Sequence, residues 1–253
     1  MSHEATLDQA ELAIKNGDPA SAERELTKTW PDMSRAPGEA QHLMAMVRMA
    51  QGRAKEAEQL MRGAIKADPT SLRHHIALGH ILTEMRNDVG AIEAYNNAAR
   101  IDATWPGLFV ALSQAYYRNG QFDEAEHAGR SAVALPNAAG WEALSNAQRA
   151  QGKMQEALNS AEEALKIDWQ EPNAQHAKAA ALMGLGRPQE ALAIFDDLFG
   201  RGIDLPVLHM NRAAALEALG RSADARAVYE EAARRWPDLP NLQDRVAQAR
   251  KRV

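Results

Sequence analysis

The stretch Gly152-Lys153-Met154-Gln155-Glu156-Ala157-Leu158 decides the fold, because its glycine, followed five residues later by an alanine, returns along the whole chain. Gly120-Gln121-Phe122-Asp123-Glu124-Ala125 repeats it closely. The alanines of this pattern follow one another at intervals of 35, 34, 34, 32, 34 and 34 residues, and they are Ala22, Ala57, Ala91, Ala125, Ala157, Ala191 and Ala225. Such regularity predicts one structural unit repeated from end to end.

The glycine of the pattern predicts a turn between two helices. Glycine accepts the left-handed backbone conformation that ends a helix, so a new helix can start within a few residues. The glycines are Gly17, Gly52, Gly120, Gly152, Gly186 and Gly220, and Arg86 takes this place once. Proline or a polar turn recurs between one such pair of helices and the next, where proline is compatible with a first helical turn.

A second alanine follows the first by seven residues at Ala64, Ala98, Ala132, Ala164 and Ala232. Residues seven apart share one stripe of a helix, and a methyl-sized side chain there lets neighbouring helices approach closely. The chain shows no alternation of apolar and polar residues that would predict strands. We therefore expect an all-α fold of stacked helical pairs.

The period and the small-residue columns resemble the tetratricopeptide repeat family. The resemblance covers residues 3–239 and implies a right-handed α-solenoid that forms a single domain over residues 1–253. We expect seven helix-turn-helix repeats, with a C-terminal capping helix over residues 240–253. The expected repeats span about 3–36, 37–71, 72–105, 106–138, 139–171, 172–205 and 206–239.

The resemblance also implies a concave groove, lined by the first helix of each pair at positions 8, 11, 14 and 15 residues before each marker alanine. The expected binding residues are His42, Met46, Met49, His80, Gln114, Tyr117, Asn146, Arg149, His176, Met183, Met210 and Asn211. The methionines indicate an adaptable apolar surface that suits an amphipathic helix or an extended apolar segment. For each methionine, the alternative that it fills a gap between helices stays open.

Composition argues against several classes of partner. The formal net charge is −5, and the basic cluster Arg250-Lys251-Arg252 fits the last turn of a helix, so we expect neither a nucleic acid nor a membrane as partner. The chain has no cysteine, which fits a reducing cytosol and equally many bacterial periplasmic proteins. Without a secretory start or a long apolar run, the expected location is cytoplasmic.

No catalytic, cofactor or metal site is expected. His74, His75 and His80 have spacings that do not place two metal ligands on one helical face, so we expect them to face solvent or line the groove. The acidic pairs Asp196-Asp197 and Glu230-Glu231 are adjacent on helices and point apart. Nucleotide-binding glycine motifs and a nucleophilic serine motif are also missing from the sequence.

Two functional hypotheses remain. The first is a non-catalytic, monomeric adaptor or scaffold that binds a partner polypeptide in its groove. The second is the substrate-recognition arm of a larger enzyme, such as a protein glycosyltransferase, whose catalytic domain is absent from this chain. The second hypothesis follows from the resemblance, because tetratricopeptide arrays resemble the N-terminal region of such enzymes.

Overall fold

A computed structural model of the protein describes residues 2–105, 107–134, 138–240 and 242–251. Over these ranges the regular elements are fifteen α-helices and one short 3-10 helix, with no strand. The expected all-α fold is therefore confirmed. The chain divides into two compact units, residues 1–120 and 121–253, and each is described separately.

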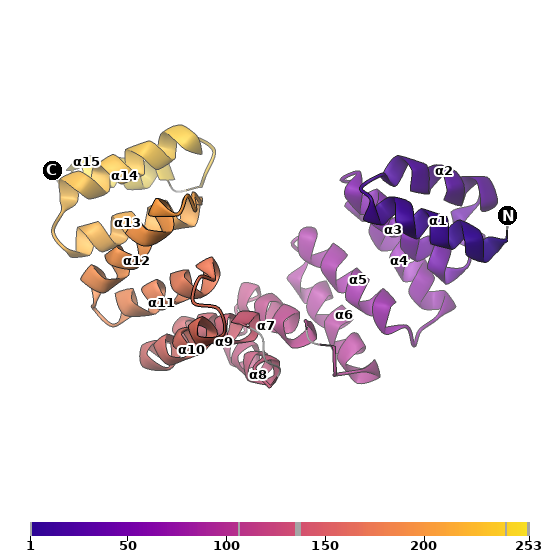
Figure 1. Cartoon of the computed structure of the whole chain (residues 1–253), viewed down its shortest axis with the longest axis horizontal. Coiled ribbons are helices and arrows are strands. Elements are labelled where there is room, and N and C mark those ends of the chain that lie inside the picture. Colours follow the sequence, from indigo (N-terminus) through magenta and orange to yellow (C-terminus); the bar gives the residue numbers. More distant parts are fainter. Residues whose placement is uncertain (1, 106, 135–137, 241, 252–253) are drawn as a thin grey trace. The chain divides into compact units, whose positions relative to one another are not determined.

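The first unit consists of antiparallel helical pairs stacked side by side (Figure 1). Each helix packs on the next one along the chain, and α1 also packs on α3, the first helix of the following pair. The helices are α1 (His3–Lys15), α2 (Pro19–Thr29), α3 (Gly38–Ala50), α4 (Ala54–Ala67), α5 (Leu72–Glu84), α6 (Asp88–Ile101) and α7 (Leu108–Arg118), with a 3-10 helix at Met33–Arg35.

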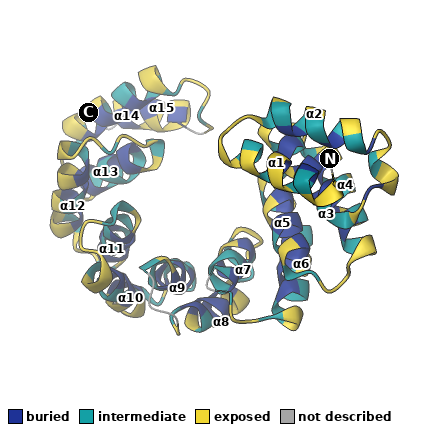
Figure 2. Cartoon of the chain, turned by 45° about the vertical axis from the view of Figure 1, so that its right-hand side comes forward, coloured by how far each residue is buried: buried dark blue, intermediate teal, exposed yellow. Residues whose placement is uncertain are grey.

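The second unit continues the pattern of pairs and ends in a single helix. Figure 2 shows its buried residues along the sides where helices face one another and exposed residues in the loops. The helices are α8 (Phe122–Ala132), α9 (Ala138–Ala150), α10 (Met154–Ile167), α11 (Pro172–Gly184), α12 (Pro188–Gly200), α13 (Pro206–Ala218), α14 (Ser222–Arg235) and α15 (Leu242–Lys251).

The last helix, α15, corresponds to the expected capping helix. It packs on α14 and buries Leu242, Val246 and Ala249, while its charged side chains face solvent. Residues 241, 252 and 253 of the expected range lie outside the described residues. This arrangement gives the last repeat a polar outer surface, which a stack of repeats needs at its end.

The predicted turns have the expected backbone conformation. Gly17 and Gly120 adopt φ angles of 74° and 76°, in the left-handed region that ends a helix. Arg86 adopts φ of 58° at the corresponding turn, even though a side chain is strained there. The turn is therefore a property of the repeat and forms at one place without glycine.

The two alanine columns form the contact surfaces between helices. All seven marker alanines and the five second-column alanines are fully buried. On the facing helix, Gly79 lies directly against the ring of Tyr95, with no space for an added methyl group. Close approach of the helices explains why these positions hold only small side chains.

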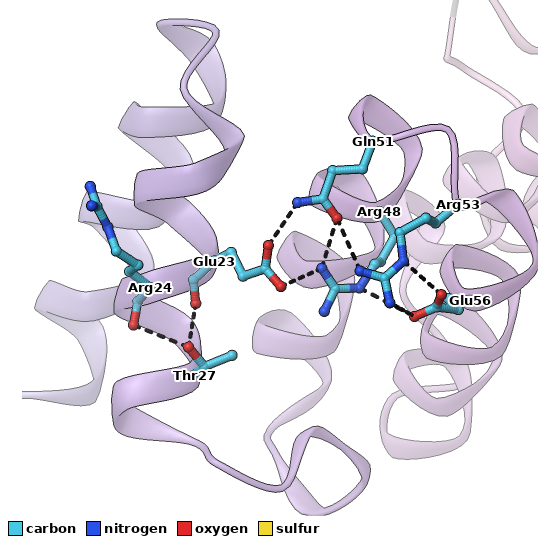
Figure 3. Close-up of polar contacts among 7 residues, drawn as sticks. All are labelled: Glu23, Arg24, Thr27, Arg48, Gln51, Arg53 and Glu56. Atoms are coloured by element: carbon cyan, nitrogen blue, oxygen red, sulfur yellow. Dashed lines mark hydrogen bonds and ion pairs between the residues drawn. The ribbon is translucent and has the colours of Figure 1, made fainter.

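A polar network ties the first two helical pairs together (Figure 3). Arg48 on α3 donates to Glu23 on α2 at 2.6 Å and to Gln51 at 2.9 Å. Gln51 also donates to Glu23, and the neighbouring pair of Arg53 and Glu56 closes the turn before α4. Because the Arg48 side chain is only 13% exposed, this network fixes α3 relative to α2 more firmly than a surface ion pair would.

Candidate functional site

The first unit contains a pocket of about 550 Å³ between α1, α3 and α5. Its size is within the usual range for ligand sites, and most of its lining side chains are apolar. The lining residues are Glu11, Ile14 and Lys15 from α1, His42, Leu43 and Met46 from α3, Leu72, Arg73, Ile76, Ala77 and His80 from α5, and Trp105 from the loop after α6. We call it the α1–α3–α5 pocket.

His42 is a neutral group in the wall of this pocket. Its side chain is buried, with 3% of the residue exposed, and its Nδ1 has no hydrogen-bond partner among the described residues. Burial lowers the pKa of His42 to about 3, and the charges of Arg73 and His74 act in the same direction. The ring is therefore uncharged at neutral pH, and the wall of the pocket remains weakly polar.

The charges at the rim of the pocket are paired with one another. Glu11 accepts from Lys15 at 3.2 Å and lies 3.5 Å from Arg73, which also pairs with Glu39 at 2.5 Å. The hydrogen bond from Lys15 holds the pKa of Glu11 below its usual range. These pairs connect α1, α3 and α5 across the opening of the pocket.

His80 and Trp105 also line the pocket. Their ring centroids are 6.1 Å apart, and the His80 ring also meets the edge of Tyr95 at 5.7 Å. Burial lowers the pKa of His80, so this imidazole is also neutral at neutral pH. The aromatic contacts position Trp105, although it lies in a loop.

The expectation that His74 and His75 face solvent or line the groove is wrong. Both are buried in α5, and only His80 of the three histidines lines the pocket. His75 is held by a contact of 3.0 Å between Nε2 and the carbonyl oxygen of Pro69, and the His74 ring packs 5.2 Å from His42. Helix packing on both sides of α5 covers positions that a single helix would leave open.

The structure brings together only some of the predicted groove residues of the first unit. His42, Met46 and His80 line the α1–α3–α5 pocket, and Met46 is exposed in it. Met49, Gln114 and Tyr117 do not line this pocket, although Gln114 is exposed on α7.

In the second unit the predicted residues form a more polar surface. Asn211 on α13 and His176 on α11 meet at 2.7 Å, and burial lowers the pKa of His176, with Arg149 adding to the effect. Asn146 and Arg149 are half-buried on α9. Burial also raises the pKa of Glu142 on the same helix.

The two predicted groove methionines of the second unit, Met183 and Met210, pack against its hydrophobic core. These contacts fit the alternative that the two methionines fill gaps between helices, because a flexible thioether side chain adapts to irregular spaces. The methionine that the structure leaves most open to a ligand is therefore Met46 in the first unit.

Several pocket residues were missed by the sequence analysis. The same spacing rule, applied to Ala22, selects Ile14 and Glu11, and applied to Ala57 it selects Leu43. Arg73 and Trp105 fall outside the rule, because they reach the pocket from the start of α5 and from a loop. No regular spacing could have revealed those two.

Among residues 2–105, 107–134, 138–240 and 242–251, no three histidine or acidic side chains are placed to hold a metal ion. No helix within the same ranges combines the length and apolar character needed to cross a membrane.

The sequence pattern of the tetratricopeptide repeat matches residues 42–106, 110–172 and 176–240. The chain belongs to the tetratricopeptide repeat family. Each match spans about four helices, two successive pairs of the repeat. Tetratricopeptide repeats generally bind protein partners and typically act as non-catalytic scaffolds.

Solved structures of tetratricopeptide proteins share the fold at low sequence identity. A tetratricopeptide repeat protein from Parabacteroides merdae has a TM-score of 0.80 at 13% identity, with 97% of this chain and 98% of that chain covered. The type IV pilus biogenesis factor PilW has a TM-score of 0.71 at 18% identity, with 82% of this chain and 97% of that chain covered.

A chain of the Cut9–Hcn1 hetero-tetramer of the APC/C has a TM-score of 0.76 at 16% identity, and the match covers 98% of this chain but 49% of that one. No functionally curated protein is significantly similar to this chain in sequence. These likenesses therefore concern the fold alone.

Proposed function

We propose that this protein is a non-catalytic module that binds an apolar segment of a partner polypeptide, helical or extended, in the α1–α3–α5 pocket. The observation that carries the proposal is the pocket itself, a space of about 550 Å³ with a largely apolar lining from three successive first helices. Apolar side chains of a partner would leave water when they enter it, and this burial favours binding.

The electrostatics of the pocket support an apolar ligand. His42 is uncharged at neutral pH, so an entering apolar group would not strip water from a charge. The charged side chains Glu11, Lys15 and Arg73 lie at the rim, where they are already paired. Met46 offers a flexible side chain that can adapt to different apolar shapes.

Polar first-helix residues of the second unit offer a different kind of contact, separate from the pocket of the first unit. Asn146 and Asn211 can form hydrogen bonds with a peptide backbone, which carries a donor and an acceptor at almost every residue.

Selection from a random peptide display library on the whole chain tests this proposal. We expect apolar peptides whose affinity falls at least about tenfold for Met46→Asp, because the new charge would have to be buried under the ligand. Val89→Asp is the matched control, since Val89 on α6 is 66% exposed and outside the pocket. Circular dichroism checks that both variants keep their helices.

Selected peptides that bind Met46→Asp as tightly as the parent chain would contradict the assignment of the pocket. Equal losses for Met46→Asp and Val89→Asp would contradict it as well, because a charge far from the pocket would then act like a charge inside it.

A further inference from the structure

His42 brings a polar group without a partner to the α1–α3–α5 pocket. The residue lines the pocket from α3 and is only 3% exposed. Among the described residues, neither of its ring nitrogens has a hydrogen-bond partner. Nδ1 is fully enclosed, whereas Nε2 keeps some accessible surface, so Nε2 is the nitrogen that a ligand in the pocket can reach. A buried polar group without a partner costs free energy, and a ligand that pairs with Nε2 would remove part of that cost.

Two further rings and a thioether line the same pocket. The rings of His80 and Trp105 have centroids 6.1 Å apart, and Met46 contributes a sulfur-containing side chain that is partly exposed. Aromatic rings pack favourably against other rings and against methionine sulfur, beyond the effect of the area that they bury. An aromatic side chain therefore suits this lining better than an aliphatic side chain of similar size.

The side chain that meets both requirements is a phenol. The hydroxyl of a tyrosine both donates and accepts, so it can pair with Nε2 of His42 in either tautomer of the neutral imidazole. A tryptophan can only donate, and therefore pairs with one tautomer alone. A phenylalanine has the ring but no polar group, and a serine has the hydroxyl but almost no apolar surface. At about 550 Å³ the pocket has room for a phenol ring and a neighbouring apolar side chain.

The charges at the rim favour a neutral ligand. Glu11 is paired with Lys15 and Arg73. Arg73 is also paired with Glu39. A charged ligand group would have to compete with these pairs and lose its water, whereas a phenol is uncharged at neutral pH. The hydrogen-bonding capacity of His42 is therefore the polar feature of the pocket that is left for a ligand.

We propose that the α1–α3–α5 pocket selects a tyrosine side chain of the partner polypeptide, whose hydroxyl forms a hydrogen bond with Nε2 of His42. This inference rests on the proposed function, because it names the residue that anchors the apolar segment in the same pocket. His42 determines specificity in this arrangement, since its ring nitrogen distinguishes tyrosine from phenylalanine. The apolar lining supplies most of the affinity for either ring.

Peptide display with one fixed residue tests the proposal. Random libraries that differ only in a central tyrosine, phenylalanine, tryptophan or serine are selected on the whole chain, and binders that are lost in Met46→Asp should come mainly from the tyrosine library. A selected peptide is then made again with phenylalanine in place of its tyrosine. We expect the parent chain to bind the phenylalanine form about tenfold more weakly in calorimetric titrations, because Nε2 loses its partner.

His42→Phe separates the hydrogen bond from a purely structural effect. This variant cannot pair with the hydroxyl, so it should bind the tyrosine and phenylalanine forms of the peptide with equal affinity. A structural role of His42 would instead weaken both forms by the same factor and leave their ratio unchanged. His75→Phe is the matched control, since His75 is also buried in the first unit but does not line the pocket, and it should keep the preference for tyrosine. Circular dichroism checks the helices of both variants.

Equal affinity of the parent chain for the two forms of the peptide would overturn the inference, and this comparison needs no variant of the protein. A His42→Phe variant that keeps the preference for tyrosine would overturn it as well. Selected peptides without tyrosine that are lost in Met46→Asp would overturn the inference but leave the proposed function standing, because they still occupy the pocket. Libraries without any binder that depends on Met46 would overturn both.

Discussion

The imidazole rings of His42 and His74 lie 5.2 Å apart, one on α3 and the other on α5, next to the α1–α3–α5 pocket. Neither Nδ1 atom has a hydrogen-bond partner among the described residues, and both residues are buried. A proton added to the His42 ring would place a charge in a buried site that the charges of Arg73 and His74 also disfavour. The buried His42 therefore makes the first unit sensitive to acid.

The first prediction concerns the free energy of unfolding and its dependence on pH. The pKa of His42 is about 3 in the folded chain, below its ordinary value, because of burial and the charges of Arg73 and His74, which outweigh the opposing effect of Glu11. The unfolded chain therefore binds more protons between these two pKa values, and acid lowers stability there. We expect a loss of about 2 kcal/mol from His42 between about pH 7 and about pH 5.

Urea unfolding at the two pH values measures this loss, and His42→Phe, which cannot be protonated, should reduce it by about the same amount. An undiminished pH dependence in His42→Phe would show that other groups, such as His80, are responsible.

The second prediction concerns the close contact between Gly79 on α5 and Tyr95 on α6. Gly79→Ala adds a methyl group where the buried ring of Tyr95 already lies, and we expect a net loss of about 1–2 kcal/mol despite the better helix propensity of alanine. Gly200→Ala in α12 is the control, because no atom lies near its added methyl group, and it should raise stability slightly. Thermal unfolding compares the two, and equal effects would contradict the tight contact.

The third prediction concerns the turn that lacks glycine. Arg86→Gly should raise the free energy of unfolding by up to about 1 kcal/mol, because it relieves a side chain held at positive φ. Gly120→Ala, at a corresponding turn with φ of 76°, should lower the free energy of unfolding by about 1 kcal/mol. Denaturant titrations measure both, and a destabilised Arg86→Gly variant would mean that the Arg86 side chain makes a favourable contribution that exceeds the strain.

The fourth prediction concerns the polar network between α2 and α3. Arg48→Met keeps most of the aliphatic stem but removes the donors to Glu23 and Gln51, and we expect a loss of about 1–2 kcal/mol. Arg35→Met removes an ion pair with Asp32 whose arginine side chain is 88% exposed, so it should change stability by less than about 0.5 kcal/mol. A double-mutant cycle of Arg48→Met and Glu23→Gln measures the coupling energy between these two residues. A coupling energy of zero would contradict a structural role for their ion pair.

Local features of the fold could be predicted because their causes lie within one repeat. Ala57 and Ala64 are spaced for one helical stripe, and both are fully buried. Gly52 marks a turn that needs positive φ, and it has φ of 73°. The turn at Arg86 was also predicted correctly, because the repeat period marks a turn there although arginine does not favour positive φ.

The candidate site could be predicted only in part. The spacing rule selects His42, Met46 and His80 because they recur on one face of successive first helices, but it does not select Arg73 or Trp105. Met183 satisfies the rule and yet packs against the core of the second unit.

By itself, the sequence determined the helical pairs, their turns and the small residues at their contacts, because periodicity and backbone conformation are local properties. Only the tertiary structure decided that His74 and His75 are buried, that α1, α3 and α5 enclose a pocket, and that Trp169 is left uncovered. Burial depends on which side chains of neighbouring repeats fill or leave a space, and that is a property of the stacked helices together.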